Sequence, residues 1–213
     1  MTKKSIPFYS NTPDDTHCYQ AALKMIIAYF SPDENYSWKE LEEISAKVPK
    51  LWTWPTAGQL WLRNKGLDII SVDSFDREKF ILNGEKYLLD FYGEEVGKEQ
   101  IAHSNIDQEV EIMKRAVENI GYKTGIPTTD DLKKFIDNGY LLICNVNGNT
   151  LNSENGYTGH FVVIFDYDEN SFFLHNPGLP ARPNQEIVID QFLKAWAYPA
   201  DKSQNVMAIR KQK

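Results

Sequence analysis

A cysteine, a histidine and an asparagine stand where nucleophilic catalysis is usually built. Cys18 opens a strongly apolar segment over 18–30, and His160 opens a second apolar run over 160–167. Asn176 follows one hairpin later, directly before a proline. A thiol becomes a nucleophile when an imidazole takes its proton, and a carboxamide can orient that imidazole. These residues predict a catalytic set with Cys18 as nucleophile, His160 as proton carrier and Asn176 holding the ring.

The position of Cys18 also predicts its ionisation. A helix that is apolar all round is a central, buried one, and the pattern after Cys18 predicts such a helix over 18–30. Free N–H groups and the positive end of the helix dipole meet at its start, which favours the thiolate. The alternative is a small apolar core residue, the role expected of Cys144 inside the apolar run 141–146. Two distant cysteines in such a chain predict free thiols.

Capping signals and periodicity predict the elements that position these residues. Ser37 and Glu40 form a capping box before a second helix, and a third helix is expected over 54–64 with Gly66 as its stop. Later segments favour a helix over 128–137, strands over 140–146, 160–167, 171–175, 186–189 and 206–210, and a helix over 190–197. Helices first and an antiparallel sheet later predict the α+β class.

The middle of the chain is the least regular part. Residues 67–125 predict only one helix, over 107–119 with Gly121 as its stop. We therefore expect a single domain over 1–213 that carries an insertion or subdomain at about 67–125. The polar, turn-rich residues 147–158 predict a surface loop.

Composition limits the partners. The chain has 213 residues, 42% of them hydrophobic, and a formal net charge of −7. Nucleic acid and anionic membranes are not expected partners, because both need basic surface. The N-terminus lacks an apolar run long enough for a signal peptide, so we expect a cytoplasmic protein.

A metal site is an alternative to the proposed catalytic set. It would use Cys18 with His17, His160 and His175, yet adjacent residues cannot easily face one ion. No close ligand pair at the usual spacing exists either, so no metal or other cofactor is expected.

The residues named so far resemble a known family, the papain-like cysteine peptidases that process double-glycine leader peptides. The resemblance rests on Gly159 to Val163 and Asn176 to Gly178, and covers roughly 5–30 and 139–200. It implies a papain-like fold, with N-terminal helices packed on a C-terminal antiparallel sheet. It also implies that Cys18, His160 and Asn176 cleave a peptide or small amide.

Two positions depart from the family pattern. The family has a glutamine shortly before the cysteine, whose side chain joins the cysteine N–H in binding the oxyanion. Asn11 is the candidate for that role here, although it is one methylene shorter. Tyr19 stands where relatives often have glycine, and with Trp54 it is a candidate substrate-binding residue. An acyltransferase on the same scaffold and a catalytically weak peptide-binding domain are the alternatives to a hydrolase, and the oligomeric state is not predicted.

Overall fold

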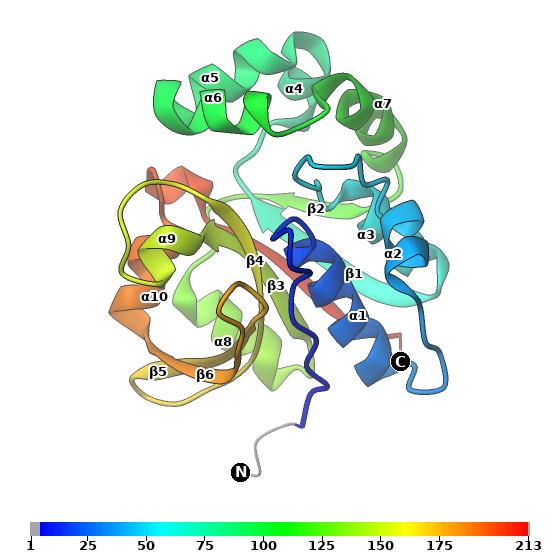
Figure 1. Cartoon of the computed structure of the whole chain (residues 1–213), viewed down its shortest axis with the longest axis vertical. Coiled ribbons are helices and arrows are strands. Elements are labelled where there is room, and N and C mark those ends of the chain that lie inside the picture. Colours follow the sequence, from blue (N-terminus) through cyan, green and yellow to red (C-terminus); the bar gives the residue numbers. More distant parts are fainter. Residues whose placement is uncertain (1–4, 213) are drawn as a thin grey trace.

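A computed structural model describes residues 5–212 of the chain. Within that part, seven strands form one sheet in the order β2-β1-β7-β3-β4-β5-β6 (Figure 1). Neighbouring strands are antiparallel except for the parallel pair β1 and β2. The strands are β1 (Leu67–Asp73), β2 (Gly121–Thr124), β3 (Leu141–Asn147), β4 (Gly159–Tyr167), β5 (Ser171–Asn176), β6 (Arg182–Val188) and β7 (Asn205–Lys211). The α+β class is confirmed.

Helices cover both faces of this sheet. They are α1 (Cys18–Phe30), α2 (Trp38–Ile44), α3 (Thr56–Asn64), α4 (Arg77–Asn83), α5 (Glu85–Tyr92), α6 (Glu94–Ala102), α7 (Ile106–Ala116), α8 (Thr129–Asp137), α9 (Gly148–Leu151) and α10 (Ile189–Trp196). Apolar side chains of α1, α2 and α3 pack on one face, and those of α8 and α10 pack on the other.

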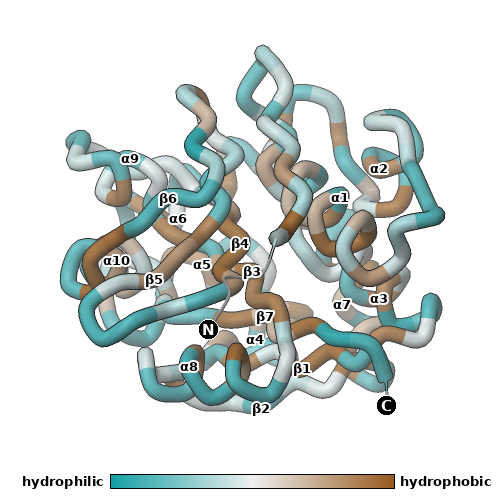
Figure 2. The backbone as a smooth tube through the Cα atoms, turned by 90° about the horizontal axis from the view of Figure 1, so that it is seen from below, coloured by the Kyte–Doolittle hydropathy of each residue, from teal (hydrophilic) through white to brown (hydrophobic). Residues whose placement is uncertain are grey.

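Period-two alternation in β3 divides these two cores. Leu141 and Ile143 belong to the α1 side, whereas Leu142 and Cys144 belong to the α10 side. Figure 2 shows the apolar chain concentrated along β3, β4 and β7, with polar segments at the periphery. Cys144 is fully buried and both cysteines are free thiols, as predicted.

Several predicted elements are confirmed because their signals are local. The central helix spans Cys18 to Phe30 as expected, and both capping boxes, at Ser37 and Thr128, are formed. The predicted hairpin corresponds to β4 and β5. Helices α2 and α8 begin at side chains that bond the adjacent backbone, whereas α1 has no side-chain cap and is recognised by its apolar run.

The middle segment was predicted incompletely. It contains β1, β2 and three short helices, α4 to α6, that the pattern did not reveal. Gly121 opens β2 instead of ending a helix, because α7 already ends at Ala116. The stretch 147–158 is not only a surface loop, since it includes α9 and buries Asn147 and Leu151.

Helices α4 to α7, residues 77–116, form a separate layer that we call the cap. Figure 1 shows the cap above the end of the sheet at which α1 begins. Its apolar core contains Phe80, Tyr87, Leu88, Ile106 and Met113, together with Phe75 from the segment leading into the cap. No helix in the range 5–212 is both long enough and apolar enough to cross a membrane.

Candidate active site

A cavity at the start of α1 brings together residues that lie far apart in the sequence. Cys18 is the first residue of α1, and His160 is the second residue of β4; both line this cavity. The backbone N–H of Phe161, the residue after His160, is hydrogen-bonded to the Cys18 sulfur. The thiol therefore lies where the helix begins and directly beside the strand that carries the imidazole.

The imidazole of His160 is held by Asn176 at the end of β5. Its Nε2 atom lies 2.8 Å from Asn176 Oδ1. The same oxygen accepts the Gly178 N–H at 3.1 Å, and Asn176 Nδ2 donates to Gln185 Oε1 at 3.2 Å. Because the oxygen can only accept, Nε2 carries the ring proton and Nδ1 keeps a lone pair. His160 is thus arranged as a neutral base.

Burial dominates the ionisation of both groups. Burial raises the pKa of Cys18 to about 11, and the N–H groups of Phe161 and Tyr19 offset only part of this rise. Burial also lowers the pKa of His160, against a smaller opposing effect of the Asn176 hydrogen bond. The expectation that the helix start makes Cys18 a thiolate is therefore wrong, because desolvation outweighs the N–H groups that favour the charged form. A neutral thiol beside a neutral imidazole requires proton transfer during attack.

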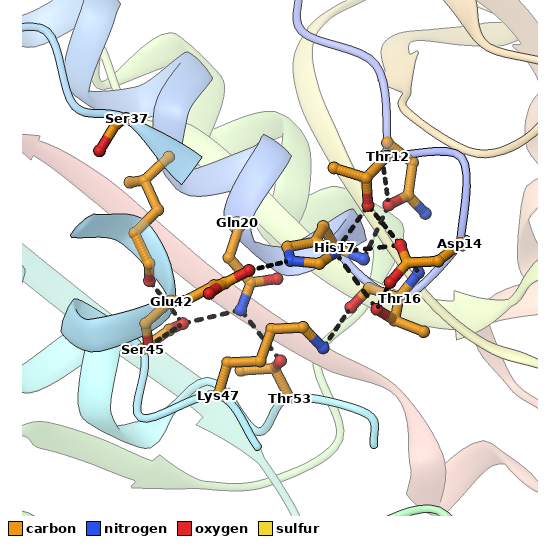
Figure 3. Close-up of polar contacts among 12 residues, drawn as sticks. Thr12, Asp14, Thr16, His17, Gln20, Ser37, Glu42, Ser45, Lys47 and Thr53 are labelled. Carbon is orange, nitrogen blue, oxygen red and sulfur yellow. Dashed lines mark hydrogen bonds and ion pairs between the residues drawn. The ribbon is translucent and has the colours of Figure 1, made fainter. Parts of the chain in front are cut away.

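A hydrogen-bonded cluster around His17 fixes the loop that leads into α1 (Figure 3). His17 Nε2 lies 2.7 Å from Glu42 Oε1 of α2, and Nδ1 lies 2.6 Å from Thr12 Oγ1. Lys47 Nζ donates to the Thr16 carbonyl at 3.0 Å from the other side. His17 is the residue before Cys18, so these contacts set where the helix and its thiol begin.

Asn11 belongs to this loop and does not line the cavity. Its Oδ1 atom accepts the His17 N–H at 2.7 Å and the Thr12 N–H at 2.9 Å. Its Nδ2 atom donates to Asp15 Oδ1 at 2.7 Å. The geometry therefore does not bring Asn11 to the thiol as an oxyanion donor, because its short side chain is engaged with the adjacent loop.

Tyr19 and Trp54 both lie in the cavity wall. The buried Tyr19 hydroxyl donates to the Pro55 carbonyl at 2.8 Å. Trp54 Nε1 donates to Ser104 Oγ at 3.0 Å, and its ring stacks on Phe80 at 5.2 Å. Each ring is thus held firmly while one of its surfaces meets the cavity.

The histidines of the metal alternative are used elsewhere. His17 and His175 do not line the cavity, and His175 bonds the Ile6 carbonyl at 3.0 Å and the Asn184 N–H at 3.0 Å. Over residues 5–212, no group of three or more histidine, cysteine, aspartate or glutamate side chains is arranged to hold a metal ion.

Comparison with known proteins identifies the architecture. No family model and no curated protein matches the sequence. The peptidase domain of Streptococcus ComA, a bifunctional ABC transporter involved in quorum sensing, matches with a TM-score of 0.54 at 12% identity, covering 98% of this chain and 100% of that one. A double-glycine-motif protease from an AMS/PCAT transporter, solved with its leader peptide, matches with a TM-score of 0.50 at 12% identity, covering 99% and 94%.

The chain has a papain-like peptidase fold. The predicted resemblance to double-glycine peptidases is thereby confirmed at the level of structure. In this papain-like fold the cysteine helix α1 packs against β4, the strand that carries His160.

Two contributors to the site were missed from the sequence. Gly178 lies against the imidazole and the carboxamide, although its Asn-Pro-Gly context indicated only a turn. Asp15 lines the cavity; its carboxylate adds to the rise in the pKa of Cys18 and opposes part of the lowering of the pKa of His160 by burial. Its left-handed backbone, with φ of 55°, was not predictable from a turn-rich loop.

Gly178 gives a sharp test of the paired side chains. A Cβ atom there would lie 3.1 Å from Asn176 Oδ1 and 3.2 Å from His160 Cε1. Those atoms belong to side chains that are tied together, so Gly178→Ala must displace the pair. We expect kcat for the amide hydrolysis proposed below to fall about tenfold, equivalent to about 1.4 kcal/mol.

Steady-state kinetics and urea unfolding would separate this effect from a loss of stability. Gly125→Ala is the matched control, because nothing lies within 4 Å of its added Cβ. An unchanged kcat in Gly178→Ala would mean that the pair tolerates the shift.

Proposed function

We propose that this protein is a cysteine hydrolase that cleaves the amide bond of a peptide or small amide. The observation that carries the proposal is the His160 to Asn176 hydrogen bond, formed beside a thiol that accepts the Phe161 N–H. The nucleophile and the base line one cavity, and the base is bonded to a buried residue that orients it, which is the arrangement that thiol catalysis needs. The likeness in fold to peptidase domains supports the same reaction class.

The reaction would begin with transfer of the Cys18 proton to His160 Nδ1. The sulfur forms a bond to the carbonyl carbon, and the oxyanion accepts a hydrogen bond from the Cys18 N–H, which has no acceptor within α1 because it belongs to the first turn. The imidazolium then protonates the leaving nitrogen, the C–N bond breaks, and a thioester remains. Water, deprotonated by His160, attacks the thioester and releases a carboxylic acid, while the proton returns to the sulfur.

The raised pKa of Cys18 predicts the pH dependence of alkylation. Only the thiolate reacts rapidly, and its fraction increases with pH until the pKa of about 11 is reached. We expect the rate of iodoacetamide labelling at Cys18 to rise continuously from about pH 7 to about pH 10 without a plateau. Peptide mapping by mass spectrometry would measure it. A plateau below neutral pH would instead indicate a preformed thiolate–imidazolium pair.

Turnover of an amide library tests the proposal directly. Peptides and small amides are incubated with the purified chain, with and without an added amine, and product masses are recorded. Release of a carboxylic acid supports hydrolysis, whereas preferential formation of a new amide supports an acyltransferase. If no amide is cleaved and no acyl group accumulates on Cys18, the hydrolase proposal is wrong and a peptide-binding role is favoured.

A further inference from the structure

The cavity extends well beyond the catalytic residues and runs beneath the cap. Its floor crosses the end of the sheet, from Phe161 of β4 through Asn145 of β3 and Met207 of β7 to Asp73 of β1. Adjacent strands lie about 4.8 Å apart, so the floor spans about 14 Å. Its roof includes cap residues and the segment leading into the cap, namely Phe75, Phe91, Tyr92, Gln100 and Met113.

The roof is attached on both sides of the catalytic cavity. On one side, the Trp52 N–H donates to the His103 carbonyl at 2.6 Å, and the two rings stack at 4.7 Å. On the other side, Gln100 Nε2 donates to the hydroxyl of Tyr157, in the loop before β4, at 2.8 Å. Tyr157 also stacks on Tyr198 at 5.8 Å. The cap is therefore tied to the rest of the protein on both sides of the site.

The space beneath the cap is small, and the larger part of its lining surface is apolar. The cavity volume is about 150 Å³. A cavity of about 150 Å³ engineered in another protein binds one benzene molecule. Aromatic side chains line the space from the cap, from the segment leading into it, from α1 and from the segment before α3, and these are Tyr19, Trp52, Trp54, Phe75, Phe91 and Tyr92. Such a space fits one apolar ring and has no room for several residues of a peptide.

The charged side chains that line the cavity do not favour a charged ligand. At the β1 end, Arg77 Nη2 lies 2.5 Å from Asp73 Oδ2, and the guanidinium lies over the Tyr122 ring at 3.5 Å. These two groups neutralise each other. The remaining charged lining residues, Asp15 and Lys202, are both exposed to solvent.

We propose that the cap restricts this site to compact amides in which the group beside the scissile bond is a single uncharged apolar ring. An extended polypeptide would not pass beneath the roof. The inference rests on the proposed hydrolase and names its substrate class.

Chloromethyl ketones provide the test, because the Cys18 sulfur displaces chloride and records which group entered the cavity. We would compare three chloromethyl ketones: one with a benzyl group, one whose benzyl ring carries a carboxylate (the carboxybenzyl reagent), and one with a tetrapeptide ending in phenylalanine. The rate of Cys18 labelling by each reagent is divided by the rate of its reaction with glutathione. The benzyl reagent is expected to label Cys18 at least about tenfold faster than either of the others. Equal or faster labelling by the tetrapeptide or the carboxybenzyl reagent would overturn the inference.

A substitution that fills the cavity with a larger side chain gives a second, independent measurement. Met113 is buried in α7 and lines the roof, so Met113→Trp should slow benzyl labelling at least about tenfold while iodoacetamide labelling stays within about twofold. Leu82→Trp is the matched control, since Leu82 lies in the same cap but is 80% exposed. Unchanged benzyl labelling in a folded Met113→Trp would contradict the assigned space, and the comparison of reagents on the wild type holds if that variant does not fold.

The two levels of proposal fail separately. Preferred benzyl labelling without turnover of any amide would refute the hydrolase and retain the ring-sized cavity. Turnover of amides together with fast tetrapeptide labelling would retain the hydrolase and refute the restriction by the cap.

Discussion

Cys18→Ala is expected to lower kcat for amide hydrolysis on the order of 10⁴-fold or more, because no other group in the cavity can form the thioester. The loss should appear in kcat with little change in the binding of a substrate analogue, since the small side chain leaves the aromatic walls in place. Product formation by the purified variant, followed by mass spectrometry, measures it. Retention of more than about a hundredth of the activity would show that the nucleophile lies elsewhere.

The other cysteine supplies the control. Cys144 is fully buried on the α10 side of the sheet, away from the cavity. Cys144→Ala should therefore keep kcat within about twofold while lowering the free energy of unfolding by about 1 kcal/mol.

A second pair of variants tests the base. His160→Ala should lose kcat by about a thousandfold, because it removes the proton acceptor. His175→Ala should act mainly on stability, because His175 does not line the cavity and its ring nitrogens bond backbone groups of Ile6 and Asn184.

Glu109→Gln is expected to stabilise the protein by about 2 kcal/mol at about pH 8 and to have little effect at about pH 4. Glu109 lies in α7, is 5% exposed and accepts a hydrogen bond from the Thr56 hydroxyl. Burial raises its pKa to about 8, so the folded state keeps this carboxyl protonated where the unfolded chain ionises. A glutamine still accepts the Thr56 hydrogen bond and never ionises.

The sign follows from the proton balance. The folded protein binds more protons between the ordinary glutamate pKa of 4.5 and the raised value of about 8, so wild-type stability falls as pH rises through that window. The full shift would correspond to more than 4 kcal/mol at about 1.4 kcal/mol per unit, and local relaxation reduces it.

Urea unfolding at the two pH values measures this difference. Glu111→Gln is the matched control on the same helix, because its exposed ion pair with Lys114 should contribute less than about 1 kcal/mol. A Glu109→Gln variant with the same stability change at both pH values would show that ionisation is not the cause.

Several features were predictable because short stretches of sequence encode them. The apolar run after Cys18 predicted α1, and the side chains of Ser37 and Thr128 announced the starts of α2 and α8. Two apolar runs on either side of the turn at 168–170 predicted the hairpin of β4 and β5, which places His160 and Asn176 on adjacent strands. Residues of adjacent strands can be matched from sequence because the turn between them sets their register.

Other features depend on contacts between distant segments. Strand β2 has no apolar alternation and forms only by pairing with β1, and α4 to α6 are short helices whose packing supplies their stability. The pKa of Cys18 is raised, whereas the sequence predicted that it is lowered, and the reason is similar. The helix start is visible in the sequence, whereas the burial of the sulfur is a property of the packed cavity.

The sequence by itself determined which residue types stand at the start of one helix and at the ends of two neighbouring strands, because capping, periodicity and turn chemistry act over a few residues. Only the tertiary structure decided how those residues behave and what can reach them. In that structure Asn11 is hydrogen-bonded to Asp15, the Cys18 thiol is buried, and cap residues line the cavity. Desolvation and enclosure depend on the sum of many long-range contacts, and no local pattern encodes that sum.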